Sequence, residues 1–186
     1  MTSGGLQAIR RHVLDLDDFS REEIIQVLKN TTAMKEVLQR DIRKVPTLRG
    51  KTIITMFYEP STRTRASFEQ AGKILSADVI NISASGSSLE KGESLYNTSL
   101  TLQAMNADTI VIRHPHSGAA HFLARHLETS IINAGDGRHA HPTQALLDLY
   151  TIQSHLGRLD GIKVAIVGDI LYSRVARSNL WGLTHM

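Results

Sequence analysis

The chain of 186 residues is long enough to bury a hydrophobic core and to form one large domain, or one domain and part of another. Its 21 Lys and Arg against 18 Asp and Glu leave a formal charge of +3. The basic residues are dispersed, so we expect no nucleic-acid partner. The absence of Cys excludes a disulfide framework and a thiolate metal site, and no apolar run approaches the roughly 20 residues that span a bilayer. We therefore expect a soluble, cytoplasmic protein without a membrane partner.

The first elements are a helix and a strand. Ser20 and Glu23 have the spacing of a capping box, and the apolar residues that follow recur at helical intervals, which predicts a helix over 20–40. The run KTIITMFY (51–58) is β-branched and largely apolar, as is typical of a buried parallel strand, and Pro60 bars its continuation.

Helices and strands then alternate along the chain. The pattern predicts helices at about 62–75, 94–105, 117–128 and 142–157, the last with Pro142 at its first position, and strands at 77–83, 107–113 and 130–133. This alternation favours an α/β fold with a doubly wound parallel sheet.

The pattern restarts after the helix at 142–157, where KVAIVGD (163–169) predicts another buried strand followed by one helix. We therefore divide the chain into a first domain (1–141), an interdomain helix (142–157) and the incomplete start of a second α/β domain (158–186). One strand and one helix cannot cover their own apolar faces, so we expect the tail after about residue 158 to be mobile or association-prone.

The turn STRTR lies between the first strand and the helix that follows it. Free backbone N–H groups and the positive end of the helix dipole converge at such a place, which suits an anion. Two arginines add planar charged groups and three hydroxyls add short donors, so the set matches the oxygens of a phosphate. The alternative is an ordinary Ser or Thr N-cap beside two solvated arginines. The residues are Ser61, Thr62, Arg63, Thr64 and Arg65.

Four motifs together point to one enzyme family: STRTRASFE, SSLEKGESL, IRHP and NAGDGRHAHPTQALLDL. From about residue 10 to about residue 182 the sequence resembles the aspartate/ornithine carbamoyltransferase family, and within it the branch that acts on aspartate. The ornithine branch typically has Cys where Thr143 stands and lacks the SSLxKGE pattern to which Lys91 belongs.

The resemblance implies transfer of the carbamoyl group of carbamoyl phosphate to the amine of L-aspartate, in pyrimidine biosynthesis, without a metal or organic cofactor. The family's later residues that select aspartate lie beyond the last residue of this chain. We therefore expect the 186-residue chain alone to be inactive. Two alternatives stay open: a carbamoyltransferase for another amine, such as ornithine, or a non-catalytic phosphate-binding or assembly fragment.

The resemblance also implies roles for single residues. Thr64, Arg113 and His141 would surround the oxyanion that forms when an amine attacks the carbonyl carbon, and preorganised donors strengthen as that charge develops. Arg63 would assist the phosphate leaving group, and Gln144 would orient the carbamoyl amide. The phosphate oxygens would be bound by Ser61, Thr62, Arg63 and Thr64. Arg174 matches the arginine that holds the aspartate carboxylate, with a solvated arginine early in a helix as its alternative.

The Ser- and Gly-rich loop at 82–94 is long for a connection between a strand and a helix. In the family this loop reaches the active site of a neighbouring subunit, so Ser87 and Lys91 would complete a site shared between subunits of a homotrimer. From the residues alone, a solvated surface loop is the simpler interpretation. Regulatory or dihydroorotase subunits are further candidate partners, but no motif in the chain encodes such contacts.

His139 and His141 in RHAHP raise the alternative of a metal site. Asp136 is the one acidic residue near them at ligand spacing, and no His pair recurs at i, i+4, so we expect no metal. His141 precedes Pro142 at a helix start and fits a neutral hydrogen-bond donor better, because the positive end of the helix dipole disfavours its protonation.

Overall fold

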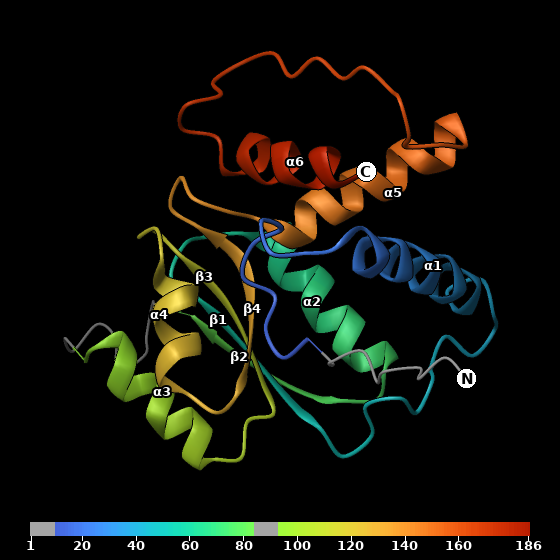
Figure 1. Ribbon diagram of the computed structural model, residues 1–186. Coiled ribbons are helices and arrows are strands. Elements are labelled where there is room, and N and C mark those ends of the chain that lie inside the picture. The colour runs from blue at the N-terminus through green and yellow to red at the C-terminus, as the bar shows by residue number, and fades with distance from the viewer. Residues whose placement is uncertain (1–9, 84–92) are drawn as a thin grey trace, which may run out of the picture.

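In the computed structural model of the chain, which describes residues 10–83 and 93–186, a parallel sheet lies between two layers of helices (Figure 1). The described strands are β1 (Thr52–Phe57), β2 (Asp78–Ser83), β3 (Thr109–His114) and β4 (Ser130–Asp136). The described helices are α1 (Arg21–Val37), α2 (Thr62–Ile74), α3 (Leu95–Ala104), α4 (Ala119–His126), α5 (Pro142–Leu156) and α6 (Arg174–His185). The predicted elements up to α5 are confirmed, with ends displaced by no more than three residues.

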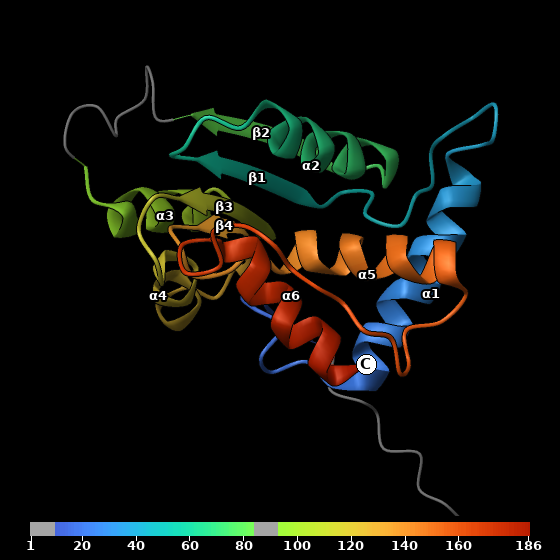
Figure 2. The same cartoon turned by 90° about the horizontal axis from the view of Figure 1, so that it is seen from above.

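The strand order is β2-β1-β3-β4, and all neighbouring strands are parallel. From β1 the chain moves to one side for β2, then crosses to the other side for β3 and β4. Right-handed crossovers in opposite directions place their helices on opposite faces of a sheet. Accordingly α2 and α5 cover one face and α3 and α4 the other (Figure 2). The predicted doubly wound sheet is confirmed, with its switch point between β1 and β3.

Each face of the sheet has its own apolar core, because successive side chains of a strand point to opposite faces. One core packs Ile54 and Met56 of β1 against Leu102 of α3 and Leu123 of α4. The other places Phe57 of β1 against neighbours on the face that α2 covers, which are Val111, Ala134 and Phe68. Strands buried on both sides require continuous apolar runs, which is why they could be recognised in the sequence.

A third apolar cluster lies beside the sheet, where α1, α5 and α6 meet. Leu16, Ile24 and Leu149 are all fully buried in it. The capping box that starts α1 is confirmed, since Ser20 Oγ accepts a hydrogen bond from the backbone N–H of Glu23, while the Glu23 carboxylate accepts one from the backbone N–H of Ser20. α1 therefore begins where the sequence predicts and packs on α5 rather than on the sheet.

The strand predicted at 163–169 is wrong. These residues form no regular structure and belong to a surface connection between α5 and α6, in which Val167 is 94% exposed. A parallel strand needs a neighbouring strand to pair its N–H and C=O groups, and none lies beside this segment in the described part of the chain. Its apolar residues were sufficient to suggest a strand but not to form one.

The tail after residue 158 has two parts: the surface connection just described, and α6, which packs closely on α5 (Figure 1). Gly182 allows this approach: a Cβ atom at this position would lie 3.0 Å from the Cδ1 atoms of both Leu149 and Leu16.

Among the residues that the structure describes, no helix combines the length and apolar character needed to cross a membrane.

Candidate active site

The candidate site lies at the carboxyl edge of the sheet, beside the switch point between β1 and β3. Phe57, at the end of β1, pairs with Arg113 of β3, and the backbone N–H of Tyr58 donates to the Arg113 carbonyl at 2.9 Å. This parallel register brings the turn that follows β1 beside Arg113, although α2, β2 and α3 separate them in the sequence. Open α/β sheets bind ligands at this edge, where the strand order reverses.

The turn after β1 leads directly into α2. Ser61 is the N-cap residue, and its side chain makes no capping hydrogen bond to the helix. The first turn of α2 contains no acidic residue. Its leading N–H groups have no partners within the helix and carry the positive end of the dipole, so this end of α2 suits an anion, as predicted.

A cavity of about 300 Å³ opens beside the start of α2. Ser61 and Thr62 line it, as the prediction requires, but the arginine that lines it is Arg65. Arg63 is exposed and Thr64 is half-buried, and neither lines this cavity. Positions 63 and 65 are separated by about 200° around a helix, so the two arginines lie on different sides of α2. The full lining is Phe57, Tyr58, Glu59, Pro60, Ser61, Thr62, Arg65 and Ser83.

Glu59 joins two arginines from distant parts of the chain. Its Oε2 atom lies 3.2 Å from Nε of Arg113 and 3.0 Å from Nη2 of Arg174. Arg113 also donates to the carbonyl of Ala134 at 3.2 Å, and Arg174 donates to that of Gly137 at 2.9 Å. Burial lowers the pKa of Arg113, and the Arg174 charge acts in the same direction, while Glu59 opposes both. The structure thus brings Arg113 and Arg174 together, and Arg174, with its side chain 16% exposed, is not a solvated arginine.

Gly135 allows the two arginines to lie against the end of β4. Its φ of +114° is a conformation that residues with a side chain rarely adopt. A Cβ atom there would lie 2.9 Å from Nε of Arg174 and 3.3 Å from Nη1 of Arg113. The first glycine of the NAGDG stretch is therefore needed for two reasons: it adopts the positive φ, and it leaves room for the two arginines.

His141 is the N-cap residue of α5 and is 7% exposed. Its backbone N–H donates to Ser178 Oγ at 2.9 Å, and the Ser178 hydroxyl donates to Asp15 Oδ1 at 3.0 Å. Burial, with the charges of Arg113 and Arg174 acting in the same direction, lowers the pKa of His141 to about 4. The imidazole is neutral near pH 7, in agreement with the predicted neutral donor, although burial is the main cause.

Gln144 lies in the first turn of α5, next to His141, but its side chain has another partner. Its Nε2 atom donates to Asp148 Oδ1 at 2.9 Å, and Asn179 of α6 donates to the other oxygen of that carboxylate at 2.7 Å. This contact uses one N–H of the amide, and the second N–H and the carbonyl oxygen are left for a ligand. Ser87 and Lys91 lie outside the described residues, so their place in the site stays a prediction.

Sequence reasoning missed several residues of this edge. Glu59 had a recognisable signal, since it is a carboxylate placed directly between a buried strand and the STRTR turn. Arg65 was considered only as one of two arginines in the turn. The support of His141 by Ser178 and Asp15 had no local signal, because 163 residues separate the last two.

Comparisons with known proteins identify the family of the chain. A family model described as "Aspartate/ornithine carbamoyltransferase, carbamoyl-P binding domain" matches residues 11–154. The chain belongs to this family. It is 64% identical over 184 residues to the aspartate carbamoyltransferase catalytic subunit of Roseiflexus castenholzii, an alignment that covers 99% of the chain and 58% of the relative. It is 59% identical over 174 residues to the subunit of the same name from Desulforudis audaxviator, with 94% and 57% covered.

Solved structures of relatives have the same fold. The aspartate transcarbamoylase of Trypanosoma cruzi in complex with carbamoyl phosphate and aspartate matches with a TM-score of 0.89 at 35% identity, covering 94% of this chain and 54% of that one. The catalytic subunit of M. jannaschii aspartate transcarbamoylase matches with a TM-score of 0.85 at 46% identity, covering 94% and 57%. The chain therefore spans a little more than half the length of the relatives that it matches.

Proposed function

We propose that this chain is the N-terminal part of an aspartate carbamoyltransferase catalytic subunit. The whole protein transfers the carbamoyl group of carbamoyl phosphate to L-aspartate, giving N-carbamoyl-L-aspartate and phosphate, in de novo pyrimidine biosynthesis. The observation that carries this proposal is the phosphate-type turn at the start of α2, held by strand register beside Arg113. The names of the relatives and the carbamoyl phosphate and aspartate in the T. cruzi structure support it.

In this proposal, residues at this edge of the sheet act as donors at each stage of the transfer. The first turn of α2 receives the phosphate, with Ser61, Thr62 and Thr64 as hydroxyl donors and Arg63 as a charge for the leaving group. The amine nitrogen of aspartate bonds to the carbonyl carbon, which becomes tetrahedral and carries an oxyanion. Its C–O bond to phosphate then breaks, phosphate leaves with that oxygen, and the attacking nitrogen gives up one proton, which the leaving phosphate accepts.

Arg113 and His141 act on the carbonyl oxygen in this proposal, together with Thr64. A neutral His141 can donate one ring N–H, and the guanidinium of Arg113 supplies charge at a largely buried position. Gln144 orients the carbamoyl amide through the amide atoms that Asp148 does not use. Arg174 binds a carboxylate of the substrate aspartate. This carboxylate either displaces Glu59 from Arg174 or shares Arg174 with it.

The domain division follows from this reading: residues 1–141 bind carbamoyl phosphate, 142–157 form the interdomain helix and 158–186 begin the aspartate-binding domain. Ser87 and Lys91 would complete a site in a neighbouring subunit of a cytoplasmic homotrimer. The chain alone lacks much of the length of its relatives, so we expect it to bind carbamoyl phosphate weakly and to have no aspartate-dependent turnover.

The test uses the chain extended with the C-terminal part of the R. castenholzii relative. Carbamoyl phosphate is supplied with aspartate or with ornithine, and product is measured directly. We expect turnover with aspartate only, and a loss of about 10²- to 10³-fold on Arg63→Ala. Arg49→Ala, which removes an exposed arginine just before β1, at the opposite edge of the sheet, is the control. Turnover with ornithine, or an Arg63→Ala variant as active as the control, contradicts the proposal.

A further inference from the structure

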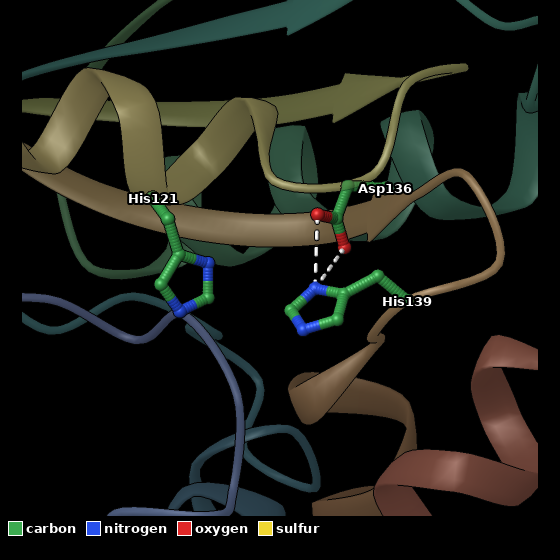
Figure 3. A group of neighbouring side chains, drawn as sticks. All are labelled: His121, Asp136 and His139. Carbon is green, nitrogen blue, oxygen red and sulfur yellow. Dashed lines mark hydrogen bonds and ion pairs between the residues drawn. The ribbon is translucent and has the colours of Figure 1, made fainter.

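A group of three metal-ligand side chains lies beside the candidate active site but does not belong to it. His121 comes from α4, Asp136 from the end of β4 and His139 from the connection between β4 and α5 (Figure 3). One ligand atom from each residue can be chosen so that all three lie within 4.8 Å of one another. The sequence alone offers only His139, His141 and Asp136 as metal ligands here, because only the fold brings His121 of α4 to this loop.

The Asp136 carboxylate has one exchangeable position. It is 1% exposed and accepts hydrogen bonds from the backbone N–H groups of Gly118 at 2.6 Å and Ala140 at 3.1 Å, and from the side-chain amide of Asn133 at 2.8 Å. These donors are fixed by the fold. The remaining contact is with His139 Nδ1, at 3.1 Å from Oδ2. A carboxylate offers about four acceptor positions, so a cation that displaces His139 finds the fourth one open.

His121 contributes a nitrogen without a partner. Its Nδ1 atom is buried and makes no hydrogen bond to any of the described residues. Its ring is in a T-shaped arrangement with that of His139, at an interplanar angle of 69° and with the ring centroids 5.2 Å apart (Figure 3). A buried ring nitrogen is normally satisfied, so an unpaired one beside a second imidazole and a buried carboxylate calls for a bound group.

The far side of His139 has the support that metal-binding histidines usually have. Its Nε2 atom lies 3.9 Å from Oδ2 of Asp15, whose side chain is 5% exposed. When one imidazole nitrogen binds a metal, the other commonly donates to a carboxylate, which fixes the ring and increases its basicity. Asp15 is positioned for this role, since Ser178 and the backbone N–H of Leu16 hold its other oxygen.

We propose that His121, Asp136 and His139 bind a divalent transition-metal ion, for which zinc is the best match. Two imidazoles and one carboxylate form a ligand set that zinc accepts, with a water as the fourth ligand. Zinc bonds of about 2.0–2.2 Å require ligand atoms closer than they now lie, and rotation of the His139 ring out of its hydrogen bond supplies the movement. The ion ties α4 to the loop that leads to His141.

The role of this ion is structural. Residues 136–141 connect β4 to the N-cap of α5, and the metal fixes this connection at both Asp136 and His139. It thereby limits the movement of His141 without contacting a reacting atom. The site is independent of carbamoyl phosphate, so its test can fail while the proposed function stands, and the reverse also holds.

The test measures zinc binding to the purified 186-residue chain by competition with a chromophoric chelator. We expect one zinc ion per chain and at least about tenfold weaker binding on His121→Ala. His121 is the residue to change because its Nδ1 atom has no partner among the described residues, so the variant keeps every hydrogen bond of the loop. His139→Gln provides a second variant, and His155→Ala, an exposed histidine of α5, is the matched control.

Two further readouts distinguish a built site from loose binding by surface histidines. Cobalt in place of zinc should give visible absorption bands of a tetrahedral site, lost on His121→Ala and kept on His155→Ala. Zinc should raise the thermal unfolding midpoint of the unaltered chain but not that of His121→Ala. The proposal is overturned if the chain binds no zinc, or if His121→Ala and His139→Gln both bind it as tightly as His155→Ala.

Discussion

Glu59 and Arg174 form an ion pair, with 3.0 Å between Oε2 and Nη2, although 115 residues separate them in the sequence. Glu59 follows β1, and Arg174 is the first residue of α6. The pair therefore ties the last helix of the chain to the turn that leads into α2. Because Arg113 shares the same carboxylate oxygen, Glu59 also compensates two neighbouring positive charges at one point.

The first prediction concerns this pair. Glu59→Gln leaves two largely buried guanidinium groups without their shared anion, so we expect the free energy of unfolding to fall by about 1–3 kcal/mol in urea titrations. Glu36→Gln removes an exposed carboxylate from α1 and should change it by no more than about 0.5 kcal/mol. Equal effects of the two substitutions would mean that the ion pair contributes nothing to stability.

The second prediction separates the two reasons for a glycine at position 135, which are its positive φ and its close contact with the arginines. Gly135→Ala combines an unfavourable φ with a clash against the arginines, whereas Gly157→Ala has a positive φ but open space around the new Cβ atom. We expect about 1 kcal/mol of destabilisation at Gly157, from backbone strain alone, and a clearly larger loss at Gly135. Unfolding curves of the two variants check this, and similar losses would show that the arginines move aside without cost.

The third prediction follows from the low pKa of His141. Its folded-state pKa of about 4 lies below the ordinary value of 6.5, so the unfolded chain takes up a proton first as the pH falls. The contribution of His141 to stability is present above pH 6.5 and is lost as the pH falls toward 4. Between pH 7 and pH 5 the loss amounts to about 2 kcal/mol.

His141→Asn provides the comparison for this measurement. Other groups titrate in both proteins and cancel in the difference between them, so the stability advantage of the unaltered chain should be about 2 kcal/mol smaller at pH 5 than at pH 7. Urea unfolding at the two pH values gives both numbers. An advantage that does not change with pH contradicts a neutral, buried His141.

The fourth prediction tests the proposed sharing of sites between subunits. In the extended protein, Lys91→Ala and Arg63→Ala chains should each be inactive alone, and a mixture refolded together should recover part of the activity. Some sites in the mixed trimers then contain both residues intact. Mixed trimers that are confirmed by mass but show no activity would place Lys91 in its own subunit's site, or in none.

The fifth prediction concerns the connection from α5 to α6. Chymotrypsin should cut early after Leu171 or Tyr172, because both are exposed and lie outside regular structure, while the buried Leu149 of α5 stays protected. After the cut, α6 should remain bound to the larger fragment until denaturant is added. Early loss of α6, or cuts within α5 at the same stage, would show that the packing around Gly182 is weak.

The sequence was most informative where one residue's environment is set by its neighbours along the chain. The runs around Ile54 and Ile110 are buried on both faces, so their strands could be recognised, and Ser20 with Glu23 marked the start of α1. The STRTR turn was recognisable for the same reason, since a helix start and its donors are local.

Features that depend on tertiary contacts could not be predicted in this way. Val167 lies in a run that resembles a strand, but no neighbouring strand in the described chain pairs with it. Likewise, Arg63 and Arg65 are alike in the sequence, and only the orientation of α2 decides that Arg65 lines the cavity. His121 approaches His139 only after β4 has paired with β3.

The position of β1 inside the sheet has a consequence for synthesis on the ribosome. β1 leaves the ribosome before both strands that flank it, so its two edges stay unpaired until β2 and then β3 have been made. The turn that carries Ser61 is therefore available early, whereas Arg113, His141 and Arg174 join it in that order as the chain lengthens. Pairing between distant segments is slow, and unpaired strand edges associate with other chains. This arrangement favours slow assembly of the anion site and makes nascent chains that end between β1 and β3 the most dependent on chaperones.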